Sequence, residues 1–458
     1  MNTKKILLSS LMLTGLAASA QNPIVQTCYS SDPAPMVHND RMYVYTGHDE
    51  AGADFFWMYE WRLYSTDDMV NWTDHGVPLS LGTFKWADDR AWAAQCIERN
   101  GKFYWYICAH SKLSGGMAIG VAVADSPTGP FKDAIGKPLF DNGKWDNIDP
   151  TVLIDDDGQA YVLWGNPNIY WAKLNNDMVS LGSEVAMIEQ TVEGFGAPQM
   201  DKREKGKKYK DNYTEGPWLS KRNGKYQLLY AAGGIPEHLA WSEADNIAGP
   251  WRYKGILMPE GNTKSFTNHC GVADYKGHSY LFYHTGKLPG GGGFGRSTAV
   301  EEFKYNADGT FPVIHPTDDG VKPVGTFSPY RKVEGETMAY SKGISTEVND
   351  KVGVYVSDIH NGDWLKLQAV DFGTSSPASI EICAASALLG GTIELHTDSI
   401  GGPLLGKVDI PRTGGWEKWQ TIKAAMSGNV TGVHDLYFVF KGYKGRKLFN
   451  IDWWRMKQ

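Results

Sequence analysis

Hydrophobic and polar residues alternate along most of the chain, in short segments separated by turn residues. In residues 149–165 a short apolar run is followed by an acidic turn with a glycine and then by a second run of β-branched and aromatic residues. Two such runs around a turn predict a β-hairpin. Long stretches with helical periodicity are scarce, so the pattern predicts an all-β protein.

The hairpin pattern recurs five times before residue 320. In each copy a lead residue precedes a first strand, a polar turn and a tyrosine in the second strand. The lead residues are Asp32, Ala93, Asp149, Glu215 and His269. Successive leads are 54 to 66 residues apart, which accommodates one four-stranded sheet per repeat. The repeat therefore predicts a five-bladed β-propeller over residues 21–320, because a propeller is built from such repeated sheets.

The chain on either side of this repeat differs in character. Residues 1–20 carry two lysines, an apolar run and then Ala18-Ser19-Ala20, the pattern of a secretory signal peptide. We therefore expect export to the periplasm or the extracellular space, and no other segment is apolar enough to span a bilayer. Residues 321–332 contain prolines and a glycine and predict a linker. Residues 333–458 again alternate apolar and polar positions, which predicts a second all-β domain, a β-sandwich of the jelly-roll type.

Composition and charge narrow the choice of protein class. Aromatic residues make up 12% of the chain and glycine numbers 52, as is typical of all-β proteins with many turns. The net charge is −7 and no long basic run is present, so we expect no nucleic-acid partner. The five cysteines are an odd number without a C-x-x-C pair, which favours buried free thiols over a disulfide framework or a zinc site.

The lead residues form the candidate site, because the innermost strands of a propeller line its axis and their starts converge at one mouth. Three leads are carboxylic acids and one is an imidazole. A single Asp-Pro is typical of a turn, but three acids packed together without a function would destabilise the fold through repulsion and desolvation. Facing carboxylates predict glycoside hydrolysis: one acid protonates the leaving oxygen, and another activates water or attacks carbon. A third carboxylate can raise the pKa of the acid.

The sequences around the three acids resemble those of glycoside hydrolase family 43. The matching segments are residues 31–35, 147–151 and 214–219, in the chain order of the family. The resemblance implies that Asp32 is the general base, that Asp149 modulates the pKa of the acid, and that Glu215 is the general acid. It also implies a five-bladed propeller and inversion of configuration, and we expect no organic cofactor.

Three further residues are candidates for binding the substrate. His269 matches an axial histidine that in many relatives binds a water or a hydrated calcium ion; a structural histidine is the alternative. Arg296 follows the glycine run 290–293 and matches the substrate-contacting arginine of the family, with a surface charge as the alternative. Trp92, beside the lead Ala93, suits stacking on a sugar, although a core aromatic has the same sequence signature.

The tail domain resembles a carbohydrate-binding module of family 6, on the segments 333–337, 361–364, 414–419 and 449–454. The resemblance implies a structural calcium ion near Glu334, Glu336 and Asp452, because calcium prefers oxygen ligands. It also implies sugar binding by Trp416 and Asn450. The family's tyrosine partner is missing from residues 356–360. The domain therefore either binds sugar weakly or only supports the enzyme.

Together these observations predict an exported, inverting exo-glycosidase acting on hemicellulose poly- or oligosaccharides. The favoured activity is that of an α-L-arabinofuranosidase on arabinoxylan, because Gly47-His48-Asp49-Glu50 and the tail domain resemble the arabinoxylan-directed branch of the family. A β-xylosidase or endo-xylanase on the same scaffold is the alternative. A noncatalytic sugar-binding propeller is the alternative from another class, and in that case the axial acids would be dispensable.

Overall fold

The computed structural model describes residues 21–197 and 212–458, and the predicted signal peptide lies outside these ranges. Within them the regular structure is almost entirely β, apart from the short helix α1 (Val192–Phe195) and the 3-10 turn η1 (Leu81–Thr83). The predicted all-β class is therefore confirmed. Neither described helix has the length and apolar character needed to cross a membrane. The five cysteines, all within the described ranges, are free thiols; four are buried and Cys28 is partly exposed.

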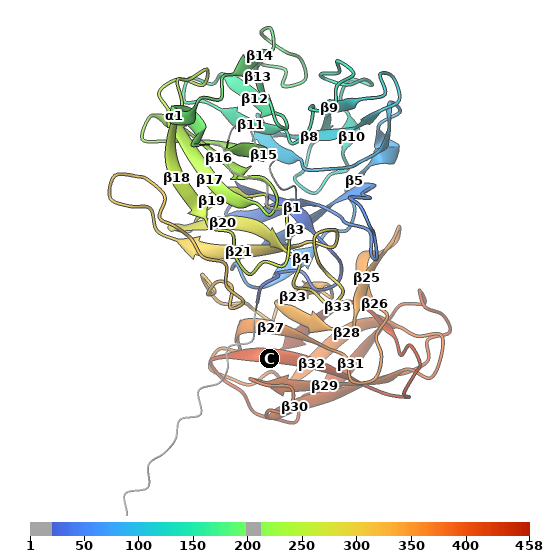
Figure 1. Ribbon diagram of the computed structural model, residues 1–458. Coiled ribbons are helices and arrows are strands. Elements are labelled where there is room, and N and C mark those ends of the chain that lie inside the picture. The colour runs from blue at the N-terminus through green and yellow to red at the C-terminus, as the bar shows by residue number, and fades with distance from the viewer. Residues whose placement is uncertain (1–20, 198–211) are drawn as a thin grey trace, which may run out of the picture.

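The strands up to residue 303 form five sheets that follow one another along the chain (Figure 1). The first contains β1 (Ser31–His38), β2 (Arg41–Gly47), β3 (Glu60–Thr66), β4 (Trp72–Asp74) and β5 (Leu79–Ser80). The second contains β6 (Ala87–Asp89), β7 (Gln95–Arg99), β8 (Lys102–Ser111), β9 (Met117–Ala124) and β10 (Lys132–Asp133).

The other three sheets have the same hairpin order. The third contains β11 (Thr151–Ile154), β12 (Ala160–Trp164), β13 (Ile169–Leu174) and β14 (Ala186–Ile188). The fourth contains β15 (Tyr213–Arg222), β16 (Lys225–Ala232), β17 (His238–Ala244) and β18 (Arg252–Met258). The fifth contains β19 (Gly271–Tyr275), β20 (His278–Thr285) and β21 (Ser297–Phe303).

The sheets form a closed ring. Contacts link β19 to β1, β1 to β7, β7 to β11 and β11 to β15, so that one strand of each sheet touches a strand of the next. Trp218 of β15 completes the ring, because a Cβ on Gly271 of β19 would lie 3.0 Å from the indole. The segment before β1 joins the two ends of the repeat: Ser30 bridges to Ser297, and its N–H donates to the Arg296 carbonyl. This ring is the propeller arrangement that the repeat predicted.

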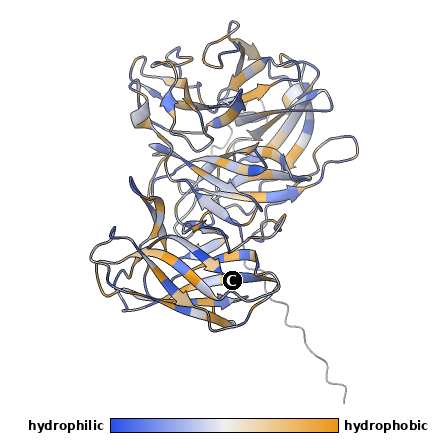
Figure 2. Cartoon of the chain, turned by 180° about the vertical axis from the view of Figure 1, so that it is seen from behind, coloured by the Kyte–Doolittle hydropathy of each residue, from blue (hydrophilic) through white to orange (hydrophobic). Residues whose placement is uncertain are grey.

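The hydrophobic pattern of the strands explains this packing. All five positions of β12 are buried, and Trp61, Trp105 and Trp164 are fully buried in the propeller. Burying a large side chain of this kind stabilises the fold by about 1.5–3 kcal/mol. Figure 2 shows hydrophobic residues recurring along the strands of both domains. Residues on both faces of β12 are therefore buried, as expected for a strand whose sheet lies between two other sheets of a propeller.

The tail domain is the predicted β-sandwich, made of two sheets. One sheet contains β22 (Val333–Glu334), β25 (Ser345–Asn349), β26 (Gly353–Ser357), β28 (Ser379–Ala385), β31 (Gln420–Ala425) and β33 (Asn450–Lys457). The other contains β24 (Tyr340–Lys342), β27 (Trp364–Asp371), β29 (Gly391–Thr397), β30 (Leu404–Ile410) and β32 (Val433–Lys441). Ile382, Phe438 and Trp454 belong to the buried core of this domain.

The tail domain is docked on the first sheet of the propeller (Figure 1). Its strand β23 (Thr337–Met338) pairs with β4 and so extends that sheet. The Asn71 side chain donates to the Gln368 carbonyl at 2.9 Å and accepts from the Gln368 N–H at 2.8 Å. Covering a sheet edge in this way satisfies backbone groups that would otherwise be open to pairing with another chain. The sandwich therefore has a fixed place against the propeller.

Candidate active site

A single cavity at the starts of the first strands is lined by all five lead residues. Its wall consists of Asp32, Phe55, Phe56, Trp92, Ala93, Trp145, Ile148, Asp149, Asn166, Glu215, His269 and Arg296. Its volume is about 150 Å³, which corresponds to about five waters and suits one sugar ring rather than a chain. The structure thus brings together every propeller residue that the sequence predicted for the site.

The backbone at the acids has an unusual conformation. Asp32 and Asp149, each followed by a proline, have φ angles of +51° and +58°, in the left-handed region that residues other than glycine rarely adopt. The residue after Glu215 is Gly216, with φ +60°. A Cβ on Gly216 would lie 2.8 Å from Nδ1 of His269, so the position requires glycine. Strained residues of this kind concentrate at functional sites.

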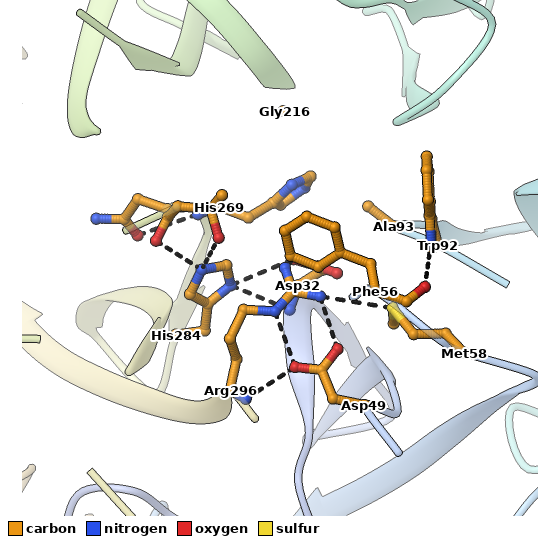
Figure 3. Close-up of polar contacts among 12 residues, drawn as sticks. Asp32, Asp49, Phe56, Met58, Trp92, Ala93, Gly216, His269, His284 and Arg296 are labelled. Atoms are coloured by element: carbon orange, nitrogen blue, oxygen red, sulfur yellow. Dashed lines mark hydrogen bonds and ion pairs between the residues drawn. The ribbon is translucent and has the colours of Figure 1, made fainter. Parts of the chain in front are cut away.

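Asp32 is held ionised by a buried arginine and a histidine (Figure 3). Its Oδ1 accepts a hydrogen bond of 2.9 Å from Arg296 Nη1 and lies 3.2 Å from His284 Nδ1. Burial by itself would raise the pKa of Asp32, but Arg296 and then His284 hold it well below its usual range. Asp32 therefore remains a carboxylate that can accept a proton.

Glu215 and Asp149 are a mutually repelling pair of carboxyl groups in the same cavity. Burial, and then repulsion by Asp32, raises the pKa of Glu215 to about 7. Burial, and then repulsion by Glu215 and Asp32, raises the pKa of Asp149 well above its usual value. Asn166 Nδ2 donates to Glu215 Oε2 at 2.6 Å, and the Gly216 N–H donates to Asp149 Oδ2 at 3.0 Å. Near neutral pH the pair therefore retains a proton, as a general acid requires.

His269 and Arg296 complete the polar wall. Burial lowers the pKa of His269 to about 4, so the imidazole is neutral and can offer a lone pair to water or a cation. The described residues contain no group of three or more His, Cys, Asp or Glu arranged to hold a metal, so the axial ion stays a prediction. Arg296 is 5% exposed and is not a surface charge. Its guanidinium donates hydrogen bonds to the carboxylates of Asp49 and Asp32 and a weaker one to Met58 Sδ, and contact with substrate stays a prediction.

Aromatic side chains surround the mouth of the cavity. Trp92 lines it but is only 8% exposed, and its Nε1 donates to the Phe56 carbonyl. Trp92 is therefore a buried core aromatic that also forms part of the cavity wall, and its stacking on a sugar stays a prediction. Trp145, which was not predicted for the site, is 50% exposed and packs edge-to-face on Trp92 with ring centroids 5.3 Å apart. An exposed indole at the mouth is a surface on which a sugar can stack.

Three polar residues of the site were also missed, namely Asp49, Asn166 and His284. All three lie at or just after the end of a second strand, β2, β12 and β20 respectively. In an antiparallel hairpin the end of the second strand lies beside the start of the first, as the pairing of Ser31 with Gly47 shows. Counting 17 residues on from Asp32 and from Asp149 gives Asp49 and Asn166, so the repeat did contain a usable signal.

The tail residues predicted to bind sugar lie together. Asn450 Nδ2 donates to the Trp416 carbonyl at 2.8 Å, and Asn450 is fully buried. Lys447 Nζ lies 5.1 Å from the centroid of the Trp416 ring, a cation–π contact. The geometry shows that Asn450 holds the Trp416 backbone, and contact of either side chain with sugar stays a prediction.

The predicted calcium ligands of the tail form an acidic group without a complete ligand set. Burial, and then repulsion by Glu334, Asp74 and Asp452, raises the pKa of Glu336 well above its usual value. Glu336 Oε2 is buried without a hydrogen-bond partner among the described residues. Glu334, however, accepts a hydrogen bond from Lys332 at 3.0 Å, and no cluster of three ligands is present in the described ranges. The orphaned Glu336 oxygen fits a cation, and the ion itself stays a prediction.

Comparisons with known proteins agree with this geometry. The model of glycosyl hydrolases family 43 matches residues 20–311, and the model of carbohydrate binding module family 6 matches residues 334–458. An arabinoxylan arabinofuranohydrolase from Bacillus subtilis (strain 168) is 32% identical over 95% of this chain and 92% of the relative. A second, from Paenibacillus polymyxa, is 31% identical over 95% of this chain and 74% of the relative.

Solved structures give the same result. The crystal structure of a family 43 arabinoxylan arabinofuranohydrolase from Bacillus subtilis, in complex with cellotetraose, has a TM-score of 0.83 at 30% identity and covers 96% of this chain and 98% of its own. A β-xylosidase/α-arabinofuranosidase from a compost metagenome, in complex with xylotriose, has a TM-score of 0.56 at 29% identity over 65% of this chain and 98% of its own. The chain therefore belongs to glycosyl hydrolases family 43, carries a family 6 carbohydrate-binding module at its C-terminal end, and is a glycosidase rather than a noncatalytic propeller.

Proposed function

We propose that the protein is an α-L-arabinofuranosidase that removes arabinofuranosyl units from arabinoxylan with inversion of configuration. The observation that carries the proposal is one sugar-sized cavity that contains both an ionised Asp32 and a Glu215 whose pKa is raised to about 7. The substrate is supported by the two relatives and the solved structure that are named arabinoxylan arabinofuranohydrolases.

In the proposed reaction one carboxyl group acts on the attacking water and another acts on the departing glycosidic oxygen. Asp32 accepts a proton from a water molecule as that water attacks the anomeric carbon of the arabinofuranosyl unit. Glu215 gives its proton to the glycosidic oxygen as the bond from that oxygen to the anomeric carbon breaks. Asp149 and Glu215 repel each other when both are ionised, which raises the pKa of Asp149 and keeps a proton on the pair. Arg296 holds Asp32 in its ionised form.

The proposal is tested by assaying the mature protein on nitrophenyl α-L-arabinofuranoside, nitrophenyl β-D-xyloside and arabinoxylan, with the released sugars identified. We expect arabinose from the first and the third substrate. Release of xylose without arabinose would overturn the arabinofuranosidase and leave the β-xylosidase, an activity that relatives named xylosidase/arabinosidase also suggest. Release of xylo-oligosaccharides alone would indicate an endo-xylanase.

Export is part of the same proposal. A polysaccharide such as arabinoxylan has to be met outside the cytoplasm, and residues 1–20 have the composition of a signal peptide. Expression of the full chain in a bacterial host should yield a mature protein in the periplasm or medium whose first residue, found by N-terminal sequencing, is Gln21. An unprocessed N-terminus in the cytoplasm would contradict export.

Asp149→Asn is expected to move the basic limb of the kcat/KM profile to lower pH, by about one unit. In the wild-type enzyme this limb marks the loss of the proton that the two carboxyl groups retain, because the pKa of Glu215 is raised to about 7 and that of Asp149 well above its usual value. Without the negative charge at position 149 ionised Glu215 is repelled less, so its pKa falls. An unchanged limb would show that Asp149 only positions substrate. Asp157→Asn, in the exposed turn of the same hairpin, is the control.

Calcium is expected to stabilise the tail domain through Glu334, Glu336 and Asp452. A ligand present at 100 times its Kd stabilises the native state by about 2.7 kcal/mol, so calcium should raise the Tm of chelator-treated protein by several degrees. Glu336→Gln should abolish this rise, whereas Glu417→Gln, at an exposed position of the same domain, should keep it. Equal melting curves with and without calcium, and no metal in the purified protein, would contradict the site.

A further inference from the structure

Asp49 is a buried carboxylate that the proposed reaction leaves without a role. It is 1% exposed, is absent from the cavity wall, and belongs to the Gly47-His48-Asp49-Glu50 motif, which begins at the last residue of β2. A Cβ on Gly47 would lie 2.3 Å from Met58 Cε and 2.9 Å from Ser31 Oγ, so a larger residue here would have to displace both side chains. His48 Nδ1 lies at hydrogen-bond distance, 2.8 Å, from the Tyr29 carbonyl. These contacts fix the position of the backbone next to Asp49.

Asp49 holds Arg296 more firmly than any other residue does (Figure 3). Its Oδ2 accepts hydrogen bonds from the backbone N–H of Arg296 at 2.8 Å and from Nε at 2.9 Å, and its Oδ1 accepts one from Nη2 at 2.8 Å. The fork-to-fork pairing of a guanidinium with a carboxylate sets both the position and the plane of the arginine. Arg296 makes a single hydrogen bond to Asp32, from Nη1 at 2.9 Å.

The remaining surroundings of the guanidinium cannot orient it in this way. The Phe56 ring centroid lies 4.8 Å from Cζ, and Met58 Sδ lies 3.5 Å from Nη2. Neither contact has the directionality of the paired hydrogen bonds, and Phe56 is part of the cavity wall. The direction in which Nη1 points therefore depends on Asp49.

We propose that Asp49 is a positioning residue for the reaction: it fixes the Arg296 guanidinium against Asp32 and offsets its charge within the active site. The inference rests on the proposed roles of Asp32 as base and Glu215 as acid. Asp49 touches neither substrate nor a reacting atom, and it acts only through Arg296.

The charge of Asp49 affects the acid as well as the base. The titratable groups that interact with Arg296 or lie against its partners are Asp32, Asp49, Asp149, Glu215, Glu237, His269 and His284. Arg296 lowers the pKa of Glu215, whereas burial and Asp32 raise it. Removing the negative charge of Asp49 leaves the positive charge of Arg296 less compensated. The pKa of Glu215 should then fall, and the basic limb of the pH profile should move to lower pH.

The test compares Asp49→Asn with Asp49→Glu across the pH range, on the nitrophenyl glycoside that the wild-type enzyme hydrolyses best. Asp49→Asn removes the charge, so we expect kcat/KM to fall by about 100-fold, the effect of misplacing a group by about 1 Å, and the basic limb to move to lower pH. Asp49→Glu keeps the charge but lengthens the side chain. It should lower kcat/KM in the same way and leave the limb in place.

Asp274→Asn is the matched control, because Asp274 also pairs with an arginine, Arg222, at 2.9 Å but is exposed and lies far along β19 from the cavity. It should change neither kcat/KM nor the limb. Circular dichroism and melting curves report the folded fraction of each variant, and rates are corrected for it. If Asp49→Asn fails to fold, the proposal is tested by whether kcat/KM falls in Asp49→Glu.

Two results would overturn the proposal. One is a kcat/KM within twofold of wild type in the folded variants. The other is a loss explained entirely by unfolded protein, with an unshifted basic limb in Asp49→Asn. The test uses whichever nitrophenyl glycoside the wild-type enzyme hydrolyses best. If the enzyme proves to be a xylosidase, the proposed function is overturned, but the role of Asp49 can still be tested on the xyloside.

Discussion

Replacing Glu215 by glutamine is expected to lower kcat on arabinoxylan by about 100- to 10,000-fold, the contribution that a positioned general acid makes. The departing xylan oxygen is a poor leaving group and needs the proton that Glu215 carries. Glutamine has nearly the same shape and still accepts the hydrogen bond from Asn166, which is 2.6 Å long in the wild-type protein, so the cavity should keep its geometry. The measurement is the initial rate of arabinose release, with Glu302→Gln, at an exposed site, as the control.

The same variant should lose much less activity on nitrophenyl α-L-arabinofuranoside. A nitrophenolate ion leaves without being protonated, so the reaction of this substrate depends little on a general acid. The ratio of the activity lost on arabinoxylan to that lost on the nitrophenyl substrate therefore identifies the role of Glu215, whatever the stability of the variant protein. Equal losses on both substrates would show that Glu215 is not the acid, and full activity on both would remove it from the mechanism.

The positions of the acids could be predicted from sequence because the repeat supplies the geometry. Aligning five hairpins places Asp32, Asp149 and Glu215 at equivalent strand starts, and the structure has all three in one cavity wall. The left-handed backbone at Asp32 and Asp149 has no signature in a single sequence, because the following prolines also occur in ordinary turns.

The residues that were missed depend on partners from a different strand or sheet. The repeat gives Asp49 a position equivalent to that of Asn166, but its function is evident only beside Arg296, which lies 247 positions away along the chain. Trp145 becomes significant only because its indole remains exposed at the mouth. The pairing of β23 with β4 involves two residues on each strand, too few to produce an alternation of apolar and polar residues in the sequence. In each case the role of the residue depends on tertiary packing, which cannot be predicted from local sequence propensities.

Replacing Asp32 by asparagine is expected to abolish the activation of water and to lower kcat/KM by about 100- to 10,000-fold on both substrates alike. The base acts on the attacking water in every case, whatever the leaving group, so the two losses should be equal, in contrast to those of the Glu215 variant. The fold should survive, because Asp49 still neutralises Arg296 through bonds of 2.8 to 2.9 Å.

The pH profile of the residual activity provides a second readout of the same variant. The low pKa of Asp32 keeps the wild-type base ionised well into the acid range, and asparagine has no such proton to lose, so the acid limb should disappear. Repulsion by Asp32 also raises the pKa of Glu215, so the basic limb should move to lower pH. Asp40→Asn, in the exposed turn after β1, is the control. Rates near wild type with Asp32→Asn, or a residual profile that keeps both limbs, would show that another group activates the water.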